Sequence, residues 1–124
     1  MSNPVKISDA EWEIMNVVWN SHPISASEII AELSGKRAWH PRTIRTLLDR
    51  LVRKKALTFE VDGKRYLYRP SISMDVCVRK ASQGFLHRVF GGEPASMLMH
   101  LVQHTELSRE EIAKLKRILS EKEK

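Results

Sequence analysis

The 124-residue sequence predicts a mainly α-helical protein that carries one small β-hairpin. Three observations predict this class. Apolar residues recur at helical spacing through most of the chain, a basic amphipathic helix begins at Pro41, and an Asp62-Gly63 turn joins two strand-like runs. The expected order is therefore three helices, a hairpin and a further helical region.

Three helix starts match the capping box, in which a serine and a glutamate three residues later bond each other's backbone N–H groups. They are Ser8-Asp9-Ala10-Glu11, Ser25-Ala26-Ser27-Glu28 and Ser108-Arg109-Glu110-Glu111. The first predicts a helix over residues 9–20 whose core stripe comprises Trp12, Met15, Val18 and Trp19. The second predicts a short helix that ends at Gly35 and carries Ile29, Ile30 and Leu33.

A third helix is expected from Pro41, because proline is favoured at the first position of a helix. Trp39, just before it, is expected to lie in the core. Helical spacing gathers apolar side chains on one side of this helix: Ile44, Leu47, Leu48, Leu51 and Val52. The other side carries Arg42, Arg45, Thr46, Arg50 and Arg53, with Asp49 as the only acid. One face should pack on a core while the other presents guanidinium and hydroxyl groups.

The hairpin is expected to comprise residues 57–61 and 64–69 around the Asp62-Gly63 turn. Counting outward from this turn pairs Phe59 with Tyr66, Leu57 with Tyr68, and Glu60 with Arg65. Three helices followed by a hairpin are the order of a winged helix-turn-helix, with the hairpin as the wing.

Residues 71–124 form a second predicted domain, after a winged-helix domain over residues 1–70. Helices are expected over residues 73–90, from Pro94 to about Gln103 after a Gly91-Gly92 break, and beyond Ser108. The middle one is apolar on nearly all sides, and so short a segment cannot bury such a surface by itself. A second copy of the chain is the expected cover. The predicted dimer contacts are Phe85, Val89, Met97, Leu98, Leu101, Val102, Ile112, Leu115 and Leu119.

The amino-acid composition limits which partners and which cellular location the protein can be expected to have. The chain has 21 basic and 15 acidic residues, a net charge of +6 and a predicted pI near 9.7, and the basic surplus is concentrated in residues 36–69. Such segregation favours a polyanion partner. The single Cys77 excludes an intrachain disulfide and is expected as a small buried thiol. No apolar run has membrane-spanning length and Met1-Ser2-Asn3-Pro4 lacks a signal pattern, so a cytoplasmic protein is expected.

No enzymatic motif and no cofactor-binding motif is present. His100 and His104 have the spacing of two metal ligands on a helix, but no acid lies between them and Cys77 and His87 are distant in sequence. They are expected to be ordinary, partly buried helix residues rather than a metal site.

Double-stranded DNA is the expected partner, because a basic third helix before a hairpin is the reading element of winged-helix proteins. Arg42, Arg45 and Thr46 are assigned to base edges or adjacent phosphates, and Thr43, Arg50 and Arg53 mainly to phosphates. Lys64 and Arg65 at the wing tip are assigned to backbone or minor groove, unless Glu60 holds Arg65. Ser25 and Ser27 could bind a phosphate near a helix start, although capping explains Ser25 equally well.

Three other interpretations remain at this point. The basic face could be merely solvated, the protein could be a sequence-indifferent architectural DNA binder, or the module could serve protein contacts alone. Charge by itself would account for the second, but it leaves Thr43 and Thr46 without a role. The third does not require concentrated arginines.

The chain resembles the penicillinase-repressor family, the BlaI/MecI type that also includes the copper-operon repressors of the CopY type. The segments that carry the resemblance are residues 7–15, Ser25-Ala26-Ser27-Glu28-Ile29-Ile30, Thr43-Ile44-Arg45-Thr46-Leu47-Leu48 with Arg50-Leu51, Gly91-Gly92, Ser96-Met97-Leu98 and Leu107-Ser108. The Thr-Ile-Arg-Thr sequence at 43–46 is the most specific of these.

The resemblance implies a dimeric repressor whose third helix enters the major groove of a palindromic operator, controlling penicillin-resistance or other stress genes. It also implies that a membrane sensor relieves repression through cleavage in the dimerisation region, which by position is the His100-Leu101 bond. Family members usually have Asn-Phe there, so this chain departs from the pattern. The cysteine cluster of the copper-sensing branch is absent after Cys77.

Overall fold

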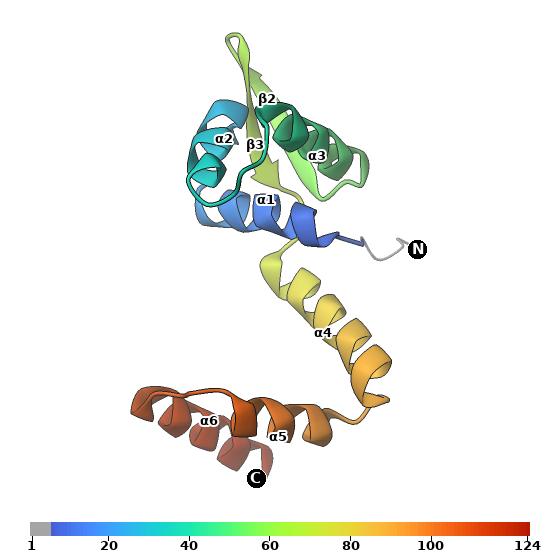
Figure 1. The fold of residues 1–124 in the computed structure, drawn as a ribbon, viewed down its shortest axis with the longest axis vertical. Helices are drawn as coiled ribbons and strands as arrows, with labels where there is room; N and C mark the ends of the chain where they lie inside the picture. The colour runs from blue at the N-terminus through green and yellow to red at the C-terminus, as the bar shows by residue number, and fades with distance from the viewer. Residues whose placement is uncertain (1–5) are drawn as a thin grey trace. The chain divides into compact units, whose positions relative to one another are not determined.

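A computed structural model describes residues 6–124, so the Met1-Pro4 stretch considered above lies outside it. Figure 1 shows the fold. The elements, in order, are α1 (Asp9–Asn20), β1 (Ile24–Ser25), α2 (Ala26–Ser34), α3 (Pro41–Arg53), β2 (Leu57–Asp62), β3 (Arg65–Pro70), α4 (Met74–Phe90), α5 (Pro94–His104) and α6 (Arg109–Lys122). The chain divides into two compact units, one that runs to Lys80 and one that comprises Ala81–Lys124. The expected mainly helical class with a small sheet is confirmed.

All three predicted capping boxes are present, at the starts of α1, α2 and α6. At α1, the Glu11 backbone N–H donates to Ser8 Oγ at 3.2 Å and the Ser8 N–H donates to Glu11 Oε1 at 2.8 Å. These bonds satisfy N–H groups that have no partner inside the helix. Local chemistry therefore sets where these helices begin, and α1 has the predicted bounds.

Helix α3 is followed by a lysine whose backbone is in the left-handed conformation. Lys55 has a φ of 66°, its N–H donates to Val52 O at 3.0 Å, and the Ala56 N–H donates to Leu51 O at 2.9 Å. This pair of bonds is the Schellman arrangement, in which glycine usually occupies the left-handed position. The arrangement turns the chain from α3 into β2.

One hydrophobic core lies between helices α1–α3 and the sheet, and its buried members are Ile14, Met15, Val17, Val18, Ile24, Ile29, Leu33, Ile44, Leu47, Leu48, Leu51, Ala56, Leu57 and Tyr68. The predicted stripe of α1 was incomplete: Ile14 and Val17 are buried, whereas Trp12 and Trp19 are only half-buried. Trp19 packs on the core edge with its Nε1–H donating to Ile72 O at 3.0 Å, and Trp39 is likewise half-buried. Tryptophan commonly occupies such positions, since its indole N–H needs a partner.

The sheet has three antiparallel strands in the order β1-β3-β2. Strand β1 was not predicted, because two residues display no periodicity. Its Ile24 pairs with Tyr68 and its Ser25 with Leu67. The sheet therefore joins the start of α2 to the wing.

The predicted hairpin register was wrong by two residues. Asp62 faces Arg65 and Phe59 faces Tyr68, because the two-residue turn is Gly63-Lys64 rather than Asp62-Gly63. Gly63 has a φ of 66° at the first turn position, where hairpin turns of the II′ type require glycine. A shift of two keeps each side chain on its expected face. It replaces the predicted partners with Leu57↔Pro70, Glu60↔Leu67 and Val61↔Tyr66.

The unit from Ala81 to Lys124 has no buried residue. Its large apolar side chains are exposed by 38% or more at Phe85, Val89, Leu98, Met99, Leu101, Val102, Ile112, Leu115, Ile118 and Leu119. Cys77, in the preceding unit, is buried, and burial raises the pKa of its thiol. Within residues 6–124, no helix combines the length and the apolar character that crossing a bilayer requires.

Candidate nucleic-acid interface

Helix α3 has one buried and one open face. Pro41 occupies its first turn, and the Arg42 backbone N–H donates to His40 Nδ1 at 3.0 Å, which caps the helix. Ile44, Leu47, Leu48 and Leu51 are buried against the core. The six predicted contact residues of this helix are all exposed: Arg42, Thr43, Arg45, Thr46, Arg50 and Arg53.

Thr46 is the only one of these six with a side-chain hydrogen bond in the described part of the chain. Its Oγ1 donates to Arg42 O at 3.0 Å, one helical turn earlier. With its proton engaged, the hydroxyl still offers lone pairs and the methyl group stays exposed. Thr46 can therefore accept from a base amino group or contact a thymine methyl group.

Ion pairing divides the basic residues of segment 36–69 into two groups. Four are paired with acids: Arg37 with Glu13, Lys54 with Glu11, Arg65 with Asp62, and Arg69 with Glu60. Among residues 6–124 no acid lies within salt-bridge distance of the others, which are Lys36, Arg42, Arg45, Arg50, Arg53, Lys55 and Lys64. Four of these seven lie on α3, so uncompensated positive charge is concentrated on its open face.

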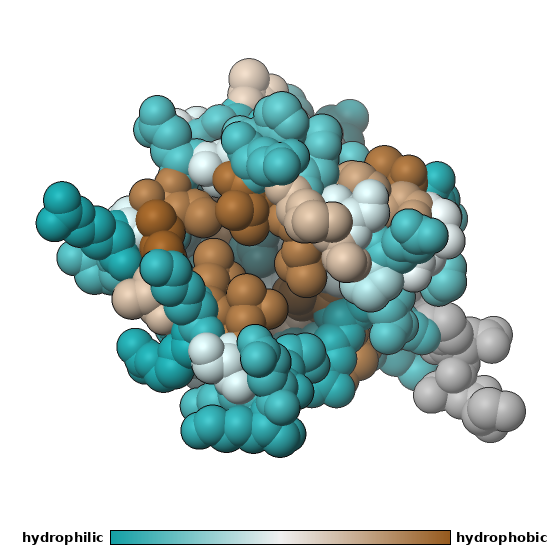
Figure 2. All heavy atoms as spheres, turned by 90° about the horizontal axis from the view of Figure 1, so that it is seen from below, coloured by the Kyte–Doolittle hydropathy of each residue, from teal (hydrophilic) through white to brown (hydrophobic). Residues whose placement is uncertain are grey.

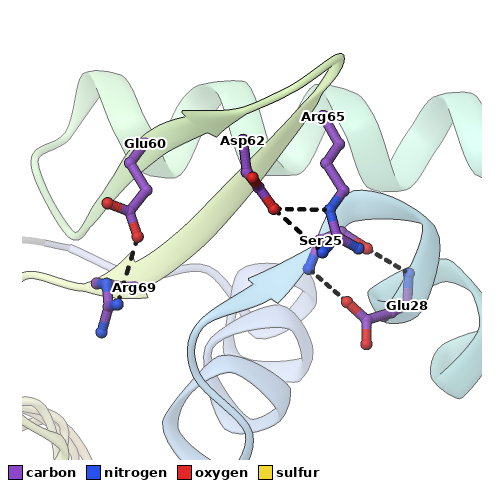
Figure 3. Close-up of polar contacts among 6 residues, drawn as sticks. All are labelled: Ser25, Glu28, Glu60, Asp62, Arg65 and Arg69. Carbon is purple, nitrogen blue, oxygen red and sulfur yellow. Dashed lines mark hydrogen bonds and ion pairs between the residues drawn. The ribbon is translucent and has the colours of Figure 1, made fainter.

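At the wing, Lys64 and Arg65 differ in their surroundings. Lys64 is exposed in the turn, whereas Arg65 Nη2 lies 3.2 Å from Asp62 Oδ2. The expected partner of Arg65 was Glu60, but Glu60 instead meets Arg69 at 3.3 Å because of the register shift. Figure 3 shows both pairs.

The two serines near α2 also differ. Ser25 is buried, its Oγ accepts from the Glu28 N–H at 3.2 Å, and its own N–H donates to Glu28 Oε1 at 3.1 Å. These bonds hold the pKa of Glu28 below its usual value (Figure 3). Capping thus occupies the Ser25 backbone N–H and the residue is buried, while Ser27 is exposed.

A buried ion pair that sequence reasoning missed joins α1 to the end of α3. Glu11 is fully buried, and its Oε1 lies 2.5 Å from Lys54 Nζ, which also donates to Lys6 O at 2.8 Å. Burial raises the pKa of Glu11, but hydrogen bonds from Lys54 and Ser8 outweigh burial and lower it overall. In the sequence, the capping box was the only sign that Glu11 has a structural role. Its pairing with Lys54 left no local pattern, because the two residues lie 43 positions apart.

The family model for penicillinase repressors matches residues 7–121. The chain belongs to the penicillinase repressor family. The penicillinase repressor of Bacillus licheniformis is 40% identical over 116 residues, which cover 94% of this chain and 91% of that protein. The methicillin resistance regulatory protein MecI of Staphylococcus aureus strain N315 is 36% identical over 117 residues, which cover 94% of this chain and 95% of that protein.

A solved structure of a DNA-bound relative matches part of this chain. It is the Bacillus licheniformis BlaI monomeric form in complex with the blaP half-operator, with a TM-score of 0.53 and 41% identity, covering 61% of this chain and 93% of that one. The winged-helix class is thereby confirmed. The family consists of transcriptional repressors and not of enzymes.

Proposed function

We propose that the protein is a homodimeric transcriptional repressor that binds a palindromic DNA operator through α3 and the wing. The observation that carries this proposal is the open face of α3, where four arginines without acidic partners among the described residues alternate with exposed threonines. The BlaI relative described above was solved in complex with a half-operator, which supports the same use here. Such a face fits a DNA groove, where guanidinium groups bind guanine edges and phosphates.

We assign each exposed residue to a base edge or to a phosphate by its position along α3. Arg42, Arg45 and Thr46 lie within its first two turns, the part of a recognition helix that contacts base edges. Thr43, Arg50 and Arg53 flank them and are assigned mainly to phosphates. Lys64 extends the positive charge at the wing tip.

Dimerisation is proposed for the carboxyl-terminal unit, because its apolar side chains have no cover within one chain. Figure 2 shows a patch of hydrophobic side chains ringed by hydrophilic ones. Leu101 is 46% exposed and Val102 52%, although both belong to a helix with little charge. A second copy would remove this surface from water and place two α3 helices on one two-fold operator. Paired half-sites bind far more tightly than single ones, so weakening the dimer would release the operator.

Relief of repression by proteolysis is proposed for the same region. His100 and Leu101 are exposed, but their peptide bond lies inside α5, whose backbone is helical from Pro94 to His104. Cleavage there would require local opening of this helix. We assign the signal to a membrane sensor or protease and the target genes to antibiotic resistance or another stress response. The names of the relatives support the resistance assignment.

The test is a protection and competition experiment on the promoter of its own gene. At physiological salt the protein should protect a two-fold symmetric site and prefer it to bulk DNA by at least about 10³-fold. Little preference would instead indicate the architectural alternative. An unprotected promoter together with no measurable DNA affinity would overturn the proposal.

Variants separate base reading from charge. Arg45→Ala should lower operator affinity by about 1–3 kcal/mol and relax the sequence preference. Lys64→Ala should weaken binding to all sequences alike and flatten the salt dependence by about one unit of slope. Lys80→Ala, at an exposed position of α4, is the control and should change neither. Equal losses on all sequences for Arg45→Ala would refute its base-reading role.

A further inference from the structure

The β-hairpin has a charged face and an aromatic face, and their side chains differ in whether they already have partners. On the charged face, Arg65 binds Asp62 and Arg69 binds Glu60, as Figure 3 shows. Within the part of the chain that the structure describes, the Tyr66 hydroxyl on the other face has no hydrogen-bond partner. The wing arginines therefore have acidic partners within the same hairpin, whereas the outer part of the aromatic face is exposed.

The aromatic face emerges gradually from the core. Tyr68 is 6% exposed, its cross-strand partner Phe59 39%, Tyr66 49% and Val61 64%. The rings of Phe59 and Tyr66 stack with centroids 4.4 Å apart, and Phe59 lies 6.0 Å from Tyr68. The outer rings are thus held in place by ring contacts that lead back to the core, and they present a preorganised surface rather than mobile side chains.

The inner end of this aromatic face belongs to the core on which α3 packs. Its inner members, Leu57 and Tyr68, belong to the same core cluster as the buried side of α3. Burial raises the pKa of Tyr68, the nearby Asp49 carboxylate raises it further, and the Arg45 guanidinium lowers it. Both charged groups belong to α3, the helix that packs against β2.

We propose that Phe59, Val61 and Tyr66 bind the sugar–phosphate backbone of double-stranded DNA, with the Tyr66 hydroxyl donating a hydrogen bond to a phosphate oxygen. The inference rests on the proposed DNA-binding function and specifies how the wing takes part in it. Tyrosine hydroxyls are regular donors to DNA phosphates. Lys64, a cation without an acidic partner in the described residues, lies in the turn at the outer end of this face, which favours a polyanion over an apolar protein surface.

The experiment compares Tyr66→Phe with Tyr68→Phe in the full-length protein. Both variants delete one hydroxyl from the same strand face, but Tyr66 is half exposed whereas Tyr68 is buried. Affinity for the operator and for an unrelated duplex is measured over a range of salt concentrations, together with urea unfolding and the oligomeric state. Tyr66→Phe should weaken binding to both duplexes by about tenfold, the loss expected for a hydrogen bond to a charged group. The salt slope should stay unchanged, because no cation is removed.

Tyr68→Phe should bind both duplexes as the unchanged protein does. Wild-type affinity for Tyr66→Phe would overturn the inference and leave the proposed function standing, whereas an unchanged protein without DNA affinity would overturn both. A Tyr66→Phe variant that alters the monomer–dimer equilibrium but not DNA affinity would also overturn it, since the face would then meet a second copy. A loss confined to the operator would assign Tyr66 to base reading instead and refute the backbone contact.

Discussion

Removing the partner of the buried Glu11 should destabilise the amino-terminal unit strongly. Lys54→Met leaves a carboxylate that is fully buried, with Oε2 already unpartnered in the described structure and Oε1 bonded only to the Ser8 N–H. Breaking a buried ion pair from one side typically costs about 3–5 kcal/mol. The Lys54 side chain is 35% exposed, so water can reach the site and the expected cost falls to about 2–3 kcal/mol.

A double-mutant cycle isolates the pair. Glu11→Gln removes the charge but keeps an oxygen that can accept from the Ser8 N–H, so it should cost about 1–2 kcal/mol. Glu11→Gln/Lys54→Met should be hardly less stable than Lys54→Met alone, which gives a coupling energy of about 1–2 kcal/mol. Urea unfolding at fixed protein concentration measures all four free energies of unfolding. Strictly additive losses, with coupling below about 0.3 kcal/mol, would refute the reasoning.

Three further outcomes are expected. Lys55→Gly should raise the free energy of unfolding, measured by urea denaturation, by about 0.5–1 kcal/mol. The reason is that relief of the left-handed backbone strain exceeds the cost of the extra entropy that glycine gives the unfolded chain. A less stable variant would contradict this. The pKa of Glu11 is lowered by folding, so its contribution is complete above its unfolded pKa and is lost as the pH falls through the folded one. Glu11→Gln should therefore show a shallower loss of stability on acidification than the unchanged protein, and parallel curves would exclude this role. Leu101→Asp should shift the protein toward monomer, as measured by light scattering. Gln103→Asp adds the same charge to the same helix and should shift it less. Equal shifts would argue against Leu101 as an interface residue.

Short-range features of the fold were predictable from the sequence. The capping boxes at Ser8, Ser25 and Ser108 act over three residues, and the structure contains all three. Helical spacing likewise identified the buried side of α3, because a regular helix carries its periodicity in the sequence itself. The exposed residues of α3 follow directly from that assignment.

Contacts between distant segments required the folded chain. The hairpin register depended on whether the turn was Asp62-Gly63 or Gly63-Lys64, and both place glycine at an allowed position. Strand β1 exists only because β3 lies beside it. The pairing of Glu11 with Lys54 joins helices that pack side by side in space but not in sequence.

By itself, the sequence determined where helices begin, which side of each helix is apolar and that the basic residues cluster around α3, because these properties depend on neighbours within a turn or two. Only the tertiary structure decided which of those basic residues remain without acidic partners in the described chain. In the folded chain, ion pairs with acids are formed by Arg37, Lys54, Arg65 and Arg69, whereas the α3 arginines have no such partner among the described residues. The physical reason is that an ion pair depends on distance in space, which strand register and helix packing set.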